Sequence, residues 1–176
     1  MGTEYITKEE LQAIKGIVTY PNVIDAWITG GALLREDSPD IDIAVYTRTK
    51  VFDCDADNFV CPGYEIEQIA PQYESEDGGK DLIIKLRPTE WNTNKRWIDL
   101  LISNKHIETL GIHLWMQKYY PFSIQCCAWS IFTETLAGRI EYDPEVIMCN
   151  SFVKSYSKYL KKYKRYYPNA SFLRAL

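Results

Sequence analysis

Two aspartates separated by one residue are the feature of this sequence best suited to chemistry. Asp40 and Asp42 open the alternating segment Asp-Ile-Asp-Ile-Ala-Val. Alternate residues of a β-strand point to one face, so the Cα atoms of the two aspartates would lie roughly 7 Å apart. Carboxylates this close favour a cation between them, and Mg²⁺ prefers such hard oxygen ligands together with phosphate oxygens. The pair therefore predicts a magnesium site at the start of a strand.

Two glycines stand upstream of this pair, after an apolar run. Gly30 and Gly31 follow Val23–Thr29, which has the composition of a short strand, and the residues from Ala32 to Arg35 could form a first helical turn. Without a Cβ, backbone amides can closely approach phosphate oxygens, and a helix N-terminus adds favourable partial charge. Two metal ions about 3.5–4 Å apart could orient an attacking hydroxyl and stabilise a pyrophosphate leaving group. The combination predicts binding of a nucleoside triphosphate.

A third acid is a candidate for the same site. Asp99 lies in Arg96–Ser103, a strand candidate in which it is flanked by apolar residues on both sides. Burial of an unpaired carboxylate is unfavourable, so an acid in this place requires a partner. One interpretation is a metal ligand that also helps to deprotonate the attacking hydroxyl. The alternative is an aspartate satisfied by backbone amides, Lys95 or Arg96.

The order strand, Gly-Gly, short helix, then Asp-x-Asp opening an apolar strand resembles the nucleotidyltransferase superfamily that includes polymerase β, poly(A) polymerases and CCA-adding enzymes. The resemblance covers about residues 20 to 105. It implies that Gly30 and Gly31 contact the triphosphate. It also implies that Asp40 and Asp42 bind both metal ions and that Asp99 completes the catalytic triad.

A narrower resemblance is to the catalytic head of bacterial CCA-adding and poly(A) polymerase enzymes. That group carries an Arg-Asp-Phe-Thr-Ile-Asn-Ala stretch, and Tyr120–Cys126 of this chain is similar to it. Gln125 stands in place of the asparagine, whereas tyrosine and proline replace Arg-Asp. Arg35 is displaced by one position from the group's Gly-Gly-x-Val-Arg pattern. The resemblance implies that Arg35 and Gln125 bind the nucleotide.

Composition indicates an ordinary globular protein with a basic end. The 176 residues are 46% hydrophobic and 25% charged, with a net charge of −4. No acid follows Glu145, and the tail interleaves cations with tyrosines. Such tails can grip single-stranded nucleic acid, although tyrosines at helical spacing also pack. The candidates for nucleic-acid contact are Lys158, Lys161, Lys162 and Arg165. We expect a cytoplasmic protein without a membrane span.

The hydrophobic pattern predicts an α+β fold, in which a small mixed β-sheet backed by helices is followed by a helical C-terminal portion. A capping box at Thr7–Glu10 begins a first helix that continues to about Val18. The acidic segment around Asp53–Asp57 is expected to be a solvated hairpin loop. Further helices are predicted over 107–119, 122–135 and 145–166. We predict a catalytic domain at 1–105 and a helical neck-like portion at 106–176.

The predicted function is magnesium-dependent transfer of a nucleoside monophosphate from ATP or another triphosphate to an acceptor hydroxyl by a two-metal mechanism. RNA is the favoured acceptor, and the 3′ end of a tRNA is one candidate. One alternative within this chemistry is nucleotidylation of a protein or small molecule, of the antitoxin or aminoglycoside type. Another is a degenerate, non-catalytic module that binds nucleotide or RNA. The choice of nucleotide and the oligomeric state stay open.

Overall fold

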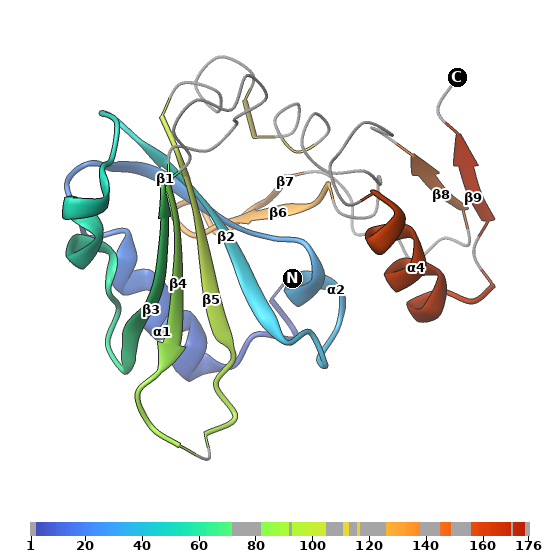
Figure 1. Cartoon of the computed structure of the whole chain (residues 1–176), viewed down its shortest axis with the longest axis horizontal. Helices are drawn as coiled ribbons and strands as arrows, with labels where there is room; N and C mark the ends of the chain where they lie inside the picture. The colour runs from blue at the N-terminus through green and yellow to red at the C-terminus, as the bar shows by residue number, and fades with distance from the viewer. Residues whose placement is uncertain are drawn as a thin grey trace.

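A mixed seven-stranded β-sheet forms the centre of the computed structural model of this chain (Figure 1). The structure describes residues 3–71, 82–91, 93–104, 111–112, 116, 126–137, 145–148, 156–169 and 171–174. In sheet order the strands are β3 (Tyr64–Pro71), β4 (Leu82–Pro88), β5 (Trp97–Ser103), β2 (Asp40–Thr47), β1 (Val23–Thr29), β6 (Ala128–Ser130) and β7 (Leu136–Ala137). Strands β2 and β5 pair in parallel, and the other neighbours in this sheet pair antiparallel.

Alternation along the central strands gives the sheet two different faces. Ile41, Ile43 and Val45 of β2 are fully buried in the main hydrophobic core. The intervening positions point to the opposite face, where Asp40 and Asp42 lie. Since the first face is committed to the main core, the pairing register is strongly specified. The other face carries the two aspartates at the start of β2 and a second hydrophobic cluster that includes Trp27, Ala44 and Leu101.

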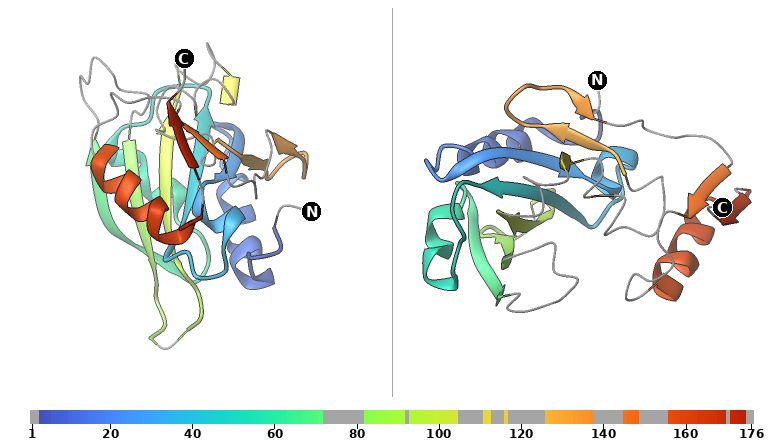
Figure 2. Two further views of the ribbon diagram at one scale, coloured as in Figure 1. Left: turned by 90° about the vertical axis from the view of Figure 1, so that its right-hand side faces the viewer. Right: turned by 90° about the horizontal axis from the view of Figure 1, so that it is seen from above.

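Helix α1 (Lys8–Ile17) packs on the core side of the sheet and is fastened at its first turn (Figures 1 and 2). The predicted capping box is confirmed: the Glu10 amide donates to Thr7 Oγ1 at 3.1 Å, and the Thr7 amide donates to Glu10 Oε2 at 3.0 Å. Ile14 and Ile17 are buried against the sheet. Glu10 also accepts hydrogen bonds from Arg96, which joins α1 to the residue before β5.

The predicted elements of the first hundred residues are largely confirmed. The strand predictions agree with β1 to β5, and the predicted helical turn after Gly30 is α2 (Gly31–Leu34). The solvated loop expected around Asp53–Asp57 was wrong. That segment is the 3₁₀ helix η1 (Asp53–Phe59), which buries Ala56 and Phe59 in the main core. A single buried aromatic at the end of an acidic segment is too sparse a pattern to predict a helix.

The predicted helical C-terminal portion is only partly confirmed, because strands β6, β7, β8 (Glu145–Met148) and β9 (Ser171–Arg174) occupy much of the described part of it. The helix expected over 122–135 was wrong where β6 pairs with the edge of β1. The helix expected over 145–166 was wrong in its first part, where β8 pairs with β9. Its last part is confirmed as α4 (Tyr156–Tyr166), and residues 149–155 lie outside the described residues. A short apolar run is compatible with a helix or with a strand, and only pairing with another strand distinguishes the two. Hydrophobic periodicity alone therefore assigned these segments wrongly. Most of the predicted helix over 107–119 lies outside the described residues.

The fold is therefore α+β, with helices backing a mixed sheet. The domain boundary after residue 105 stays a prediction, and β6 and β7 extend the same sheet from beyond it. In the part of the chain that the structure describes, the helices are too short or too polar to cross a membrane.

Candidate active site

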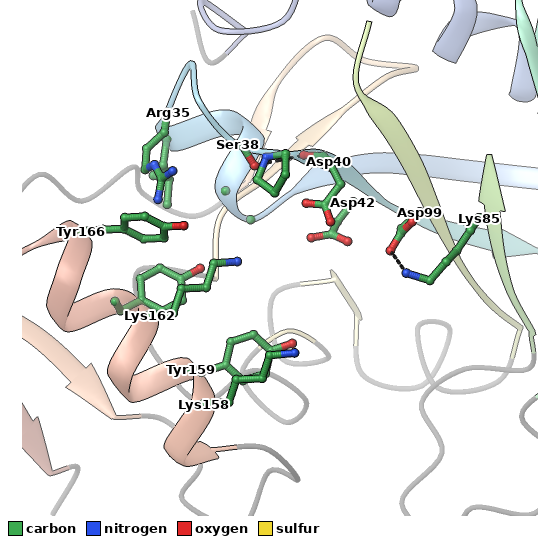
Figure 3. A pocket seen from close by; sticks show the side chains of 15 residues that line it. Arg35, Ser38, Asp40, Asp42, Lys85, Asp99, Lys158, Tyr159, Lys162 and Tyr166 are labelled. Carbon is green, nitrogen blue, oxygen red and sulfur yellow. Dashed lines mark hydrogen bonds and ion pairs between the residues drawn. The ribbon is translucent and has the colours of Figure 1, made fainter. Parts of the chain in front are cut away.

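A cavity of about 280 Å³ lies between the start of β2 and helix α4 (Figure 3). Its walls combine carboxylates, cations and phenol rings. The sheet and the adjoining loop contribute Gly30, Gly31, Asp40, Asp42, Lys85 and Asp99, whereas α4 contributes Lys158, Tyr159, Lys162, Tyr163 and Tyr166. The cavity thus unites segments that lie far apart in the sequence.

The register of two parallel strands brings the three predicted acids together. Asp42 of β2 and Asp99 of β5 are Cα partners, and Asp40 lies two residues before Asp42 on the same face. Their side chains point into the cavity (Figure 3). Three carboxylates that share one cavity repel one another, so the arrangement requires positive charge nearby.

Lys85 of β4 supplies part of that charge. Its Nζ lies 2.9 Å from Asp99 Oδ2, and the two residues are Cα partners across β4 and β5. The hydrogen bond to Asp99 raises the pKa of Lys85, and the charges of Asp40 and Asp42 act in the same direction, so the ammonium stays protonated at neutral pH. Sequence reasoning missed Lys85. The available signal was a lysine within an apolar strand, but its partner depends on the register between β4 and β5.

The donor chemistry at this site fits a metal ion only in part. Asp40 and Asp42 offer hard oxygen ligands to the cavity, as Mg²⁺ requires. Asp99 is engaged by Lys85, and the described residues contain no group of three or more His, Cys, Asp or Glu side chains arranged to hold a metal. Of the partners considered for Asp99, Arg96 instead binds Glu10.

The two glycines lie against the carboxylate pair and the loop before it. Gly30 has a φ of +69°, and a Cβ built on it would lie 3.5 Å from Asp42 Oδ2. A Cβ on Gly31 would lie 2.9 Å from Ser38 Oγ, which donates a hydrogen bond to the Asp40 carbonyl oxygen. Glycine thus lets the backbone turn directly beside the acids, and Ser38 is a second residue that the sequence did not single out.

Gly30→Ala is expected to lower the free energy of unfolding by about 1–3 kcal/mol, because residues other than glycine rarely adopt a φ of +69° together with a ψ of −140°. Urea denaturation followed by circular dichroism measures the change. An unfolding free energy equal to that of the wild type would contradict a structural requirement for glycine here.

Helix α4 closes the other side of the cavity. Tyr163 is 5% exposed and belongs to the main core; burial, aided by the charge of Asp42, raises its pKa, so the phenol stays protonated. The guanidinium of Arg35 stacks on Tyr166 with its central carbon 3.3 Å from the ring centroid (Figure 3). Such cation–π contacts stabilise the approach of two elements. Arg35 and Tyr163 therefore fix α4 over the cavity.

The cationic residues predicted on the tail do not all face the same way. Lys158 and Lys162 line the cavity, whereas Lys161 and Arg165 are not among its lining residues. Gln125, the other predicted nucleotide contact, lies outside the described residues. The tail tyrosines, which were expected to pack, do so at Tyr163, which belongs to the main core, and at Tyr159, which packs against it.

Comparison with known proteins supports the fold. No protein-family model matches the sequence, and none of the curated proteins matches it. Among solved structures, the chain is similar to one described as "The complex structure of CCA-adding enzyme with CTP", with a TM-score of 0.57 and 15% sequence identity. The match covers 92% of this chain and 38% of that one, so this chain spans less than half the length of the matched chain. The likeness shows a nucleotidyltransferase-like fold.

Proposed function

We propose that this chain is a nucleotidyltransferase that transfers a nucleoside monophosphate from a triphosphate to an acceptor hydroxyl. The observation that carries the proposal is the juxtaposition of Asp40, Asp42 and Asp99 beside Gly30–Gly31 on a nucleotidyltransferase-like sheet. In the reaction, the acceptor oxygen bonds to the α-phosphorus, the bond from this phosphorus to the bridging oxygen breaks, and pyrophosphate leaves.

We assign different roles in this reaction to the three carboxylates. Asp40 and Asp42 would hold Mg²⁺, which supplies positive charge to the phosphate oxygens and favours deprotonation of the hydroxyl. Lys85 holds Oδ2 of Asp99, and we assign Oδ1 of Asp99 to accept the hydroxyl proton. The role of Asp99 as an additional metal ligand stays a prediction.

The opposite wall suits the triphosphate. Arg35, Lys158 and Lys162 surround the cavity across from the acids. Cations in this position would neutralise the β- and γ-phosphates, and the backbone at Gly30–Gly31 allows close approach of phosphate oxygens. This assigns Lys158 and Lys162 to the nucleotide, whereas Lys161 and Arg165 are left as candidates for contact with the acceptor.

Lys158→Met is expected to raise the KM for the triphosphate about tenfold, since a charge-assisted hydrogen bond to phosphate is lost. Steady-state kinetics of nucleotide transfer measure the effect. Lys161→Met is the matched control, because this lysine belongs to the same helix but does not line the cavity. Equal KM values for the two variants would contradict the assignment.

RNA is the acceptor that we favour, because the structural neighbour is a CCA-adding enzyme and α4 carries cations beyond those in the cavity. The test is to incubate the protein with magnesium, each labelled triphosphate in turn, and RNA, and to compare the double variant Asp40→Ala/Asp42→Ala. Labelled RNA that disappears in the variant supports the proposal. If the label instead appears on a protein or an aminoglycoside, the chain is still a nucleotidyltransferase but RNA is not its acceptor.

A non-catalytic nucleotide-binding module is the second candidate function, and the pairing of Asp99 with Lys85 favours it, since a catalytic acid is occupied. Calorimetric titration with triphosphate separates the two functions. Binding of nucleotide without transfer to RNA, protein or aminoglycoside would establish the module and overturn the enzyme.

A further inference from the structure

The ion pair between Lys85 and Asp99 differs from the other described ion pairs in its surroundings. The Asp99 side chain is 13% exposed, and Asp40 and Asp42 line the same cavity. The register pairs Asp99 with Asp42 on one side and with Lys85 on the other. The ammonium therefore lies at the boundary of a three-carboxylate site, where the Lys85 side chain is partly exposed (Figure 3).

Charge balance at the site leads to a specific expectation. Four cationic side chains, Arg35, Lys85, Lys158 and Lys162, line the same cavity as the three carboxylates, and Lys85 already contacts Asp99 at 2.9 Å. The cavity therefore holds no excess negative charge that would require two divalent ions. A second divalent ion would have to displace Lys85 from Asp99 or bind beside a fixed positive charge, and at short range in a partly buried site this repulsion is strong.

We infer that Lys85 is a built-in cation of the carboxylate site, which occupies Asp99 in place of a second metal ion, so that the site takes one divalent ion, on Asp40 and Asp42. The inference rests on the proposed function for the ligand of the site, a metal–triphosphate complex. Lys85 is a positioning residue: it holds Asp99 Oδ2 and supplies permanent positive charge near the reacting phosphates. This replaces the two-ion arrangement implied by the resemblance in sequence.

Counting bound Mn²⁺ tests the inference without any turnover. Electron paramagnetic resonance of free Mn²⁺ is measured during titration of the full chain, with and without a non-hydrolysable triphosphate analogue. The wild type is expected to bind one protein-held ion. Lys85→Met is expected to bind a second ion at least about tenfold more tightly than the wild type does, because the competing charge is removed. Lys85→Met/Asp99→Asn should lose that second ion.

Lys15→Met is the matched control. Lys15 also lies 2.9 Å from a carboxylate oxygen, that of Glu134, and its side chain is 40% exposed compared with 39% for Lys85. It lies outside the carboxylate cavity, so its replacement should leave Mn²⁺ binding unchanged. Thermal unfolding by circular dichroism verifies that each variant is folded.

Two results would overturn the inference. One is a wild type that binds two ions with similar affinity, which requires no variant. The other is a folded Lys85→Met protein with the same Mn²⁺ count and affinity as the wild type. Failure of the proposed function gives a different result. If the protein transfers no nucleotide, but the wild type binds one Mn²⁺ ion and Lys85→Met binds two, the proposed function is wrong and the inference about Lys85 still holds.

Discussion

Asp42→Asn is expected to lower the rate of nucleotide transfer on the order of 10³-fold, the scale seen when an electrostatic group at a reacting centre is removed. Asp42 is the Cα partner of Asp99, and Asp42 Oδ2 is the atom closest to a Cβ built on Gly30. Asp42 therefore lies between the other acids and the turn at Gly30. The amide cannot supply the negative charge that Mg²⁺ requires.

The rate is measured with labelled triphosphate under saturating magnesium and acceptor. Asp57→Asn is the matched control, because Asp57 is an exposed aspartate of η1 outside the cavity. Transfer at the wild-type rate by a folded Asp42→Asn protein would refute the site assignment.

Glu10→Gln is expected to destabilise the fold by about 3 kcal/mol, as happens when one partner of a buried ion pair is neutralised. Glu10 has no exposed surface, and its carboxylate accepts from Arg96 through the backbone amide, Nε and Nη2 at 2.9–3.0 Å. The same carboxylate completes the capping box with Thr7. One side chain therefore holds the start of α1 and the approach to β5 together.

The effect of Glu10→Gln should depend on pH in a defined direction. Burial by itself would raise the pKa of Glu10, but the hydrogen bonds from Arg96 and Thr7 outweigh burial and lower the pKa below its ordinary value of 4.5. A carboxyl with a lowered pKa in the folded state stabilises fully above its unfolded pKa, and this stabilisation is lost as the pH falls through the folded pKa.

The difference in unfolding free energy between wild type and Glu10→Gln should therefore be constant near neutral pH and become smaller below about pH 4.5. Urea denaturation across this range measures it. Glu134→Gln is the control, since Glu134 forms an exposed ion pair with Lys15 and should change stability little. A difference that grows on acidification would contradict the buried-pair interpretation.

Local signals in the sequence predicted much of the fold. The capping box at Thr7 and Glu10 requires only residues within one helical turn, so its spacing is sufficient to predict it. The central strands have either alternating apolar and polar residues or a continuous apolar run. Because one face of the sheet is buried in the core, these patterns are easy to recognise in the sequence. The helix predictions for the segments after residue 126 were wrong because β6 and β8 are short. Each forms a strand by pairing with a segment that is distant in the sequence.

What the sequence by itself determined is the local order of the candidate site: an apolar strand, Gly30–Gly31, a short helix, then Asp40 and Asp42 on one face of a strand. The tertiary structure alone decided which groups meet there. Strand register joined Asp99 to Asp42 and Lys85 to Asp99, and the packing of Tyr163 turned Lys158 and Lys162 toward the cavity. The physical reason is that periodicity specifies which face a side chain occupies, whereas long-range pairing and packing specify its neighbour.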